Sequence, residues 1–148
     1  MNNTLETEKI QVRILSKLDV FEISNLGLQL NPDKSFEEIK QYSELMFEME
    51  NYICFGLVKN NQIIGISSGW TTIRFYSGKQ LEIDNVVISK EHQSKKYGNY
   101  MLSFIESWAK ERAYKYIELN TLVQNTKSHK FYYNFGFEIL GYHFVKKI

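Results

Sequence analysis

The sequence predicts an α/β (α+β) protein in which about four helices pack on a mixed, mostly antiparallel sheet of about seven strands. Two observations predict this class. Segments of alternating apolar and polar residues are interspersed with segments of helical spacing, in the order β-α-α-β-β-β-α-β-α-β-β. The helix expected from Tyr97 also connects two expected strands, and such a crossover makes those strands parallel. At 148 residues, we expect a single domain covering 1–148.

Composition limits the class of partner. The net charge is +1, so no overall field favours binding to nucleic acid or to a membrane. Residues 1–8 are polar and no apolar run is long enough to span a bilayer, so we expect neither a signal peptide nor a membrane segment. The single Cys54 has no intramolecular disulfide partner and is interpreted as a small buried hydrophobe. These features indicate a cytoplasmic protein.

The first half of the chain predicts a strand, two helices and a three-stranded meander. Asp19 with Glu22, and Ser35 with Glu38, have the spacing of capping boxes that begin helices. Asn60-Asn61 suits a tight hairpin turn between strands. The expected elements are, in order, a strand over Lys9–Leu15, helices over Asp19–Leu30 and Ser35–Glu50, and strands over Tyr52–Lys59, Gln62–Phe75 and Leu81–Ile88.

The second half predicts two more helices and three more strands. A polar, basic stretch separates the Leu81 strand from a helix that begins at Tyr97, and free N–H groups at that helix start favour an anion such as phosphate. Gly136 suits a left-handed helix stop. The expected elements are a helix from Tyr97 to about Arg112, a strand over Tyr116–Val123, a helix over Thr126–Asn134, and final strands over Phe137–Leu140 and Tyr142–Ile148.

Two motifs flank this part of the chain. The first is the run Gln93-Ser94-Lys95-Lys96-Tyr97-Gly98, which joins the Leu81 strand to the following helix. The second comprises Asn125, Ser128, Tyr132 and Gly136-Phe137. In this order, and with these elements between them, the motifs resemble those of the GNAT superfamily of N-acetyltransferases.

The match to that family has one main departure. The acyl-CoA loop of the family is usually Q/R-x-x-G-x-G/A, and Gln93 and Gly98 match it. Lys96 stands at the first glycine, and Ser94 stands where many members carry another. Glycine permits close backbone approach or positive φ, whereas lysine adds a cation and a Cβ. Either the loop is helical enough to tolerate Lys96, which then assists phosphate binding, or CoA binding is weakened; we favour the first.

The resemblance implies acetyl-CoA as co-substrate, with its pantetheine arm in a gap between two splayed parallel strands. Backbone groups of the Leu81 strand would pair with the arm, and the basic loop would hold the pyrophosphate. Two alternatives stay open: Lys95 and Lys96 are a solvated surface pair, and Asn125 is a helix N-cap. The implied binding residues are Val86, Val87, Ile88, Gln93, Ser94, Lys95, Lys96, Tyr97, Gly98, Asn99, Asn125 and Tyr132.

An amine must lose its proton before it attacks a thioester. For a lysine-like amine this costs about 4.6 kcal/mol at neutral pH, so a base is useful. Glu82 and Asp84 share one face of their strand, because side chains alternate. The resemblance implies that Asp84 lies near the acceptor. We expect one of the two acids to act, through water; the alternative for each is a structural role.

Tyr132 matches the family tyrosine that protonates the leaving thiolate. That transfer is uphill by roughly 2 kcal/mol, so Tyr132 alternatively positions the thiolate by hydrogen bonding. Tyr133 is a rival if the register differs by one, and either ring is alternatively a core aromatic. His129 is an alternative base on nearly the same helical face, although packing is the favoured role. No histidine or cysteine spacing indicates a metal site.

The expected acceptor is a small primary amine, lying between the first two helices, the third and fourth strands and the last strands. The sequence leaves open a peptide or protein amine, and an acyl-CoA-binding module without turnover. The final strands also offer an edge for a homodimer. Candidate acceptor residues are Tyr42, Glu44, Met46, Glu48, Met49, Trp70, Tyr76 and Tyr142.

Overall fold

The computed structural model describes residues 9–93 and 95–148, and the chain divides into two compact units, Met1–Glu118 and Leu119–Ile148. The expectation about a signal peptide falls on residues 1–8, which lie outside the described residues, as does Ser94 of the basic loop.

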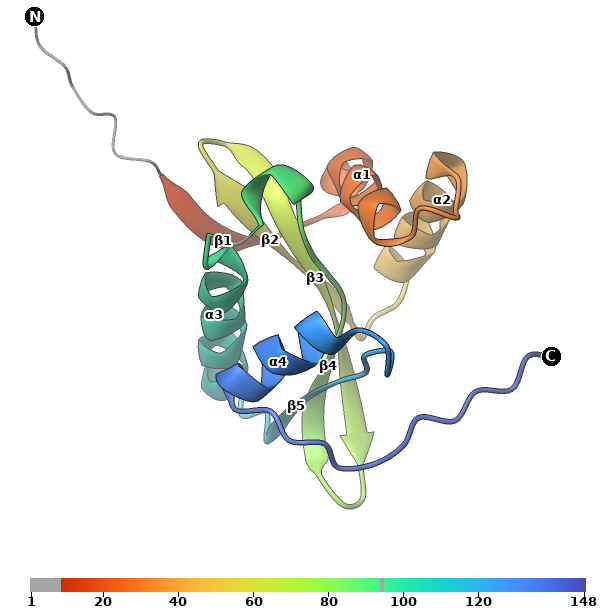
Figure 1. Ribbon diagram of the computed structural model, residues 1–148, viewed down its shortest axis with the longest axis vertical. Helices are drawn as coiled ribbons and strands as arrows, with labels where there is room; N and C mark the ends of the chain where they lie inside the picture. Colours follow the sequence, from red (N-terminus) through yellow and green to blue (C-terminus); the bar gives the residue numbers. More distant parts are fainter. Residues whose placement is uncertain (1–8, 94) are drawn as a thin grey trace, which may run out of the picture. The chain divides into compact units, whose positions relative to one another are not determined.

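Ten elements begin in the first unit, and one further helix forms the second (Figure 1). They are β1 (Ile10–Ile14), η1 (Lys17–Asp19), α1 (Val20–Leu30), α2 (Phe36–Phe47), β2 (Tyr52–Lys59), β3 (Gln62–Arg74), β4 (Gly78–Ile88), η2 (Lys90–His92), α3 (Tyr97–Glu111), β5 (Tyr116–Leu119) and, in the second unit, α4 (Thr126–Phe135). The predicted class, with four α-helices and a mixed sheet, is confirmed.

The strands form one sheet in the order β1-β2-β3-β4-β5. The first four strands are antiparallel neighbours, and β5 runs parallel to β4 because α3 carries the chain back across the sheet. Asn60 and Asn61 both have positive φ, of 47° and 66°, as the predicted tight hairpin between β2 and β3 requires. The local turn chemistry thus sets the register of this hairpin.

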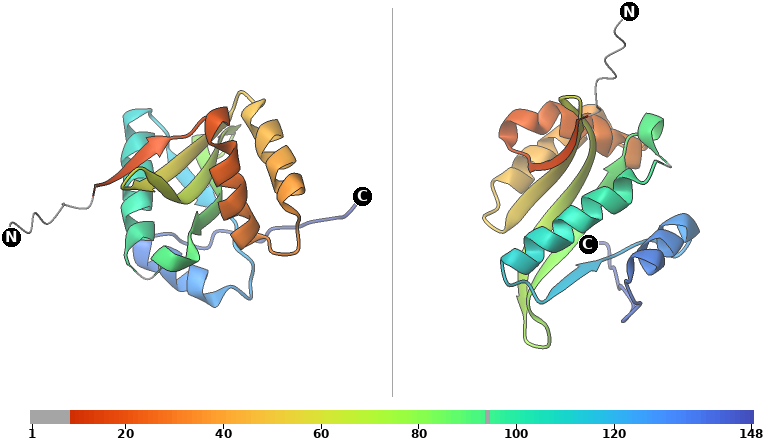
Figure 2. Two further views of the ribbon diagram at one scale, coloured as in Figure 1. Left: turned by 90° about the horizontal axis from the view of Figure 1, so that it is seen from above. Right: turned by 90° about the vertical axis from the view of Figure 1, so that its left-hand side faces the viewer.

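The two faces of the sheet are covered by different helices: α1 and α2 on one side and α3 on the other (Figure 2). Adjacent residues of β2 show the alternation. Cys54 is buried in a cluster with Ile23 and Leu26 of α1, whereas the ring of Phe55 lies 5.1 Å from that of Trp108 in α3. Each large apolar side chain buried in this way contributes about 1.5 to 3 kcal/mol.

Two expected strands are absent. The structure assigns no strand to residues 137–148, so Phe137–Leu140 and Tyr142–Ile148 are wrong as strands, and β5 is shorter than the expected Tyr116–Val123. A strand forms only where a neighbouring backbone supplies hydrogen bonds, and residues 138–148 are exposed and have none among the described residues. Among the described residues the sheet therefore has five strands rather than the expected seven.

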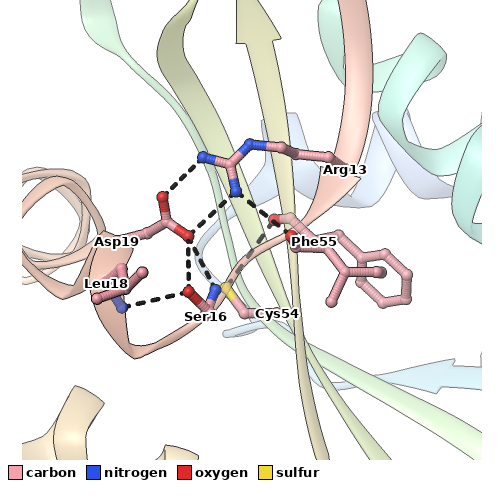
Figure 3. A network of polar contacts seen from close by, with 7 residues as sticks. Arg13, Ser16, Leu18, Asp19, Cys54 and Phe55 are labelled. Atoms are coloured by element: carbon pink, nitrogen blue, oxygen red, sulfur yellow. Dashed lines mark hydrogen bonds and ion pairs between the residues drawn. The ribbon is translucent and has the colours of Figure 1, made fainter.

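The start of α1 also differs from expectation. Ser35 and Glu38 form the predicted capping box of α2, but Asp19 does not cap α1. Instead, Asp19 completes a capping box with Ser16 at the short helix η1. Arg13 donates to both carboxylate oxygens of Asp19, at 2.7 and 3.1 Å, and this ion pair joins β1 to η1 (Figure 3). The Asp19 carboxylate is therefore engaged by Arg13 and Ser16 and makes no capping bond to α1.

The structure bears on two expectations drawn from composition, the burial of Cys54 and the lack of a membrane-spanning segment. Cys54 is a fully buried free thiol, and burial raises its pKa to about 12, so it is neutral near pH 7. Among residues 9–93 and 95–148, no helix is both long enough and apolar enough to cross a bilayer.

Replacement of Asp19 by Asn should destabilise the fold at neutral pH by about 1 kcal/mol, because it removes the negative charge that pairs with Arg13 while it keeps an oxygen that can accept the Ser16 N–H. The hydrogen bond from Arg13 lowers the pKa of Asp19. Its stabilising contribution is therefore present above the unfolded pKa of about 3.9 and is lost as the pH falls through the lower folded pKa.

Urea melts at pH 7 and at successively lower pH values measure this effect. The difference between the wild type and Asp19→Asn should shrink on acidification. The matched control is Asp33→Asn, at an exposed acid in the turn after α1, which should change stability little at any of these pH values.

Candidate active site

A bulge in β4 lies at the predicted acids. Ile66 of β3 pairs with Val87 and Ser68 pairs with Asp84, so the register shifts and β4 holds an additional residue between these pairs. Asn85 in the bulge has a left-handed backbone with φ of 49°, a conformation that asparagine tolerates better than most residues. The carboxylate of Asp84 accepts the Asn85 backbone N–H at 2.8 Å. The bulge therefore redirects the end of β4.

Beyond the bulge, one edge of β4 is open. The hydrogen-bond ladder between β4 and β5 begins where the Lys115 N–H donates to the Lys79 carbonyl at 2.8 Å. β5 has only four residues. A parallel register that starts at Lys79 ends near Ile83, because each residue of β5 advances one residue along β4. In the described part of the chain, no strand follows this edge from Val86 to Ile88. The backbone predicted to bind pantetheine thus has a strand neighbour, β3, on one side only among the described residues.

The basic loop is held by its own contacts to the sheet. The Ser89 N–H donates to the Ile64 carbonyl at 2.8 Å, and the Ser89 hydroxyl lies 2.7 Å from Nδ1 of His92. The amide of Gln93 donates to the carbonyl of Ile88 at 3.0 Å. Gln93, which was predicted to bind the cofactor, therefore anchors the loop to the end of β4.

Lys96 has the backbone conformation that glycine normally supplies. Its φ is 63° and its ψ is 11°, so α3 begins only after it, and the loop is not helical at Lys96 as the favoured alternative supposed. A left-handed non-glycine residue costs roughly 1 to 2 kcal/mol. The first helical bond of α3 runs from the Tyr100 N–H to the Lys96 carbonyl at 3.2 Å. The amides of residues 97–99 therefore precede the helical ladder and face the exposed Lys95 and Lys96 end.

The two candidate acids have different surroundings. Glu82 lies 3.6 Å from the guanidinium of Arg74, which also donates to Glu118 at 2.9 Å. That hydrogen bond raises the pKa of Arg74, which stays charged between the two carboxylates. Asp84 is exposed and bonded to the bulge. This geometry fits the structural alternative for Glu82 and leaves Asp84 accessible.

A buried polar cluster beside Asp84 was not predicted. The hydroxyl of Tyr52 lies 3.0 Å from that of Ser68, and the amide of Asn85 donates to Ser68 at 3.2 Å. Burial raises the pKa of Tyr52, so its hydroxyl stays protonated. The Asp84-Asn85 dipeptide inside an otherwise β-branched strand was the available signal for a bulge. Tyr52 and Ser68 carried no such signal, because their meeting depends on strand register.

A small cavity of about 160 Å³ opens between α1, α2 and the bulge. Of the expected acceptor residues, Tyr42 and Met46 line it, whereas the others do not. The polar cluster contributes Ser68 and Asn85 to its wall. The complete lining is Ile23, Gly27, Asn31, Lys34, Ile39, Tyr42, Ser43, Met46, Ile66, Ser68 and Asn85.

In the second unit, α4 carries the second motif. The Asn125 side chain accepts the Ser128 N–H at 3.3 Å, which is the N-cap role left open for it. The ring of Tyr132 lies 5.5 Å from that of Phe137, and Gly136 has φ of 100°, as predicted for the helix stop. His129 places Nε2 2.9 Å from the Leu122 carbonyl, a local packing contact.

Within residues 9–93 and 95–148, no three His, Cys, Asp or Glu side chains lie together in a way that could hold a metal ion.

The profile of the acetyltransferase (GNAT) family matches residues 19–137, so the chain belongs to this family. The matched range runs from the end of η1 to Phe137 and includes both motifs. The predicted resemblance is confirmed: the protein is an N-acetyltransferase of the GNAT family, which uses acetyl-CoA as co-substrate.

Three similar proteins illustrate the relationship. The uncharacterized N-acetyltransferase YhdJ of Bacillus subtilis (strain 168) is 26% identical over 137 residues, 92% of this chain and 96% of that protein. The aminoglycoside N-acetyltransferase AAC(6')-Iy in complex with CoA has a TM-score of 0.85 at 13% identity, with 98% of each chain covered. A ribosomal-protein-alanine N-acetyltransferase from Brucella melitensis biovar Abortus 2308 has a TM-score of 0.80 at 14% identity, over 95% and 100%. At these identities the structures show the fold alone.

Replacement of Lys96 by Gly should raise the free energy of unfolding by about 1 kcal/mol, because glycine adopts positive φ without the steric cost. Urea melts of the purified protein measure the change. Lys96→Ala is the matched control: it removes the same cation but keeps the Cβ, so it should bring no such gain. Equal stability of the two variants would contradict the strain assigned to this backbone.

Proposed function

We propose that residues 1–148 act as one domain that transfers an acetyl group from acetyl-CoA to a primary amine of a small molecule, in the cytoplasm. One observation carries this proposal: the family match is continuous from residue 19 to 137 and crosses the boundary between the two units at 118–119. Both units therefore belong to the segment that defines the family.

The acetyl-CoA site that we propose follows the open edge of β4 into the basic loop. The edge of β4 from Val86 to Ile88, which no described strand follows on the side away from β3, would offer backbone hydrogen bonds to the amide groups of pantetheine. The amides of residues 97–99, with Lys95 and Lys96 nearby, suit a pyrophosphate. Gln93, Ser94, Tyr97, Gly98 and Asn99 complete the proposed loop contacts.

The reaction that we propose forms one bond and breaks one. The neutral amine nitrogen attacks the thioester carbonyl, a C–N bond forms, and the C–S bond breaks to release CoA as a thiolate. The amine proton passes to Asp84 through water, and Tyr132 donates a proton to the thiolate or holds it by a hydrogen bond. Glu82 is the weaker candidate because Arg74 already lies 3.6 Å from its carboxylate.

The cavity beside the bulge supports a small acceptor. Its volume of about 160 Å³ is below the roughly 300 to 1,000 Å³ of typical ligand sites, so it suits a small amine or one amine-bearing arm. Its walls are mainly apolar and favour the uncharged form of the amine. Several structural neighbours are named as aminoglycoside acetyltransferases, and one of these is in complex with sisomicin, an observation consistent with a small amine acceptor.

The first test combines binding with turnover. A thermal melt with acetyl-CoA at one hundred times its Kd should show about 2.7 kcal/mol of added stability, which is several degrees, whereas ATP should add much less. A panel of small amines should then release free CoA thiol, and N-terminal peptides should not. A melt shift without release from any amine would leave only an acyl-CoA-binding module, and no shift would overturn the acetyl-CoA site.

Replacement of Tyr132 by Phe should lower kcat about 100-fold while the KM for acetyl-CoA changes little, because loss of a general acid affects the transition state. The measurement is steady-state thiol release at saturating amine. Tyr133→Phe, at the half-exposed neighbour, is the matched control and should keep wild-type kcat. The reverse result would assign the role to Tyr133.

A further inference from the structure

The cavity between α1, α2 and the bulge has a charge of one sign in its wall. Lys34, in the connection between α1 and α2 (Figure 1), lines the cavity, and among the described residues no Asp or Glu does. Fixed charges at a site attract ligand groups of opposite sign and repel those of the same sign. The cavity wall therefore favours an anionic group on the ligand and disfavours a second cation.

Lys34 lies at the solvent side of this cavity. Its side chain is 41% exposed, whereas Ile66 and Ser68 of β3, which also line the cavity, are each 2% exposed. A carboxylate bound at Lys34 would stay partly hydrated, which limits the cost of burying its charge. The other end of a short ligand would then lie against the sheet, beside Asn85 in the bulge.

The ammonium of Lys34 is only loosely paired with its acidic neighbour. Its Nζ lies 3.9 Å from Oε1 of Glu38, which is too long for a hydrogen bond, and both side chains are partly exposed. An exposed pair of this kind contributes little to stability. Glu38 instead accepts the Ser35 N–H at 2.9 Å in the capping box of α2. Lys34 can therefore turn toward a ligand at little cost.

A second hydrogen-bond donor lies in the same wall. The side-chain amide of Asn31, which also lines the cavity, donates to the Gly27 carbonyl at 3.1 Å. An amide nitrogen carries two N–H groups, and among the described residues the second one has no acceptor. Asn31 thus offers a directed hydrogen bond to a ligand oxygen, and Lys34 offers the charge that makes binding of a carboxylate strong.

We infer that the acceptor is a short amine that also carries a carboxylate, such as an ω-amino acid, and that Lys34 binds this carboxylate. The inference rests on the proposed function, because it names the class of amine that enters the same cavity. The amine end lies at the bulge, where Asp84 is exposed. The two ends of the ligand therefore meet charges of opposite sign, and a cavity of about 160 Å³ limits its length.

Steady-state release of free CoA thiol at saturating acetyl-CoA measures this preference. The substrates are ω-amino acids from β-alanine to δ-aminovalerate, each compared with the alkylamine and the diamine of the same number of carbons. At the preferred chain length, the amino acid should have a KM about tenfold below that of the alkylamine, the size expected for one charge-assisted hydrogen bond. The diamine should have the highest KM of the three.

Lys34→Gln should raise the KM for the amino acid about tenfold, to that of the alkylamine, because it removes the cation. Lys34→Glu should favour the diamine instead. The matched control is Lys40→Gln, which should keep the wild-type KM values. Lys40 has a 43% exposed side chain with Nζ 3.8 Å from Oε1 of Glu44, so it resembles Lys34, but it does not line the cavity. Thermal melts should show all three variants folded.

Two results would overturn the inference and leave the proposed function in place. One is thiol release with alkylamines or diamines at KM values equal to or below those of the amino acids at every chain length. The other is an equal effect of Lys34→Gln and Lys40→Gln on the KM for the amino acid. Release with no amine of any class would instead overturn the proposed function, and the inference with it.

Discussion

The left-handed backbone of Asn85 is the constraint on which the proposed site depends. It creates the bulge that shifts the register between β3 and β4, and the edge of β4 beyond the bulge follows no other strand in the described structure. In the same bulge, the side-chain amide of Asn85 donates a hydrogen bond to Ser68, and the Asp84 carboxylate accepts one from the Asn85 backbone N–H. The bulge at Asn85 therefore lies between the edge of β4 proposed for acetyl-CoA and the cavity proposed for the amine.

The basic loop shows how stability and binding are balanced at the other end of β4. Lys96 adopts a left-handed conformation that a Cβ makes sterically unfavourable. The loop around it is held by hydrogen bonds from Ser89 to Ile64 and from Gln93 to Ile88. Those bonds stabilise the loop and offset the strain. In the acetyl-CoA site that we propose, the ammonium of Lys96 would add an attraction for phosphate that glycine lacks, beside the amides at the positive end of the α3 dipole.

The polar groups near the cavity differ in how far they are buried. Tyr52 and Ser68 are enclosed and hydrogen-bonded, and the raised pKa of Tyr52 keeps it from accepting a proton from an amine near neutral pH. Asp84 is exposed to water and free of ion pairing with Arg74, which lies near Glu82 instead. This difference in surroundings is the reason that we propose Asp84, rather than Glu82 or Tyr52, as the group that accepts the amine proton through water.

The sequence by itself determined the family, the order of the first nine helices and strands, the hairpin at Asn60-Asn61 and the capping box at Ser35, because these depend on residues close together in the chain. Tertiary structure alone decided the remainder. Asp19 bonds to Arg13 and Ser16 rather than capping α1, and strand register brings Tyr52 to Ser68. Residues 138–148 form no strand, and among the described residues no backbone pairs with them. Such outcomes depend on partners distant in sequence, which local patterns do not specify.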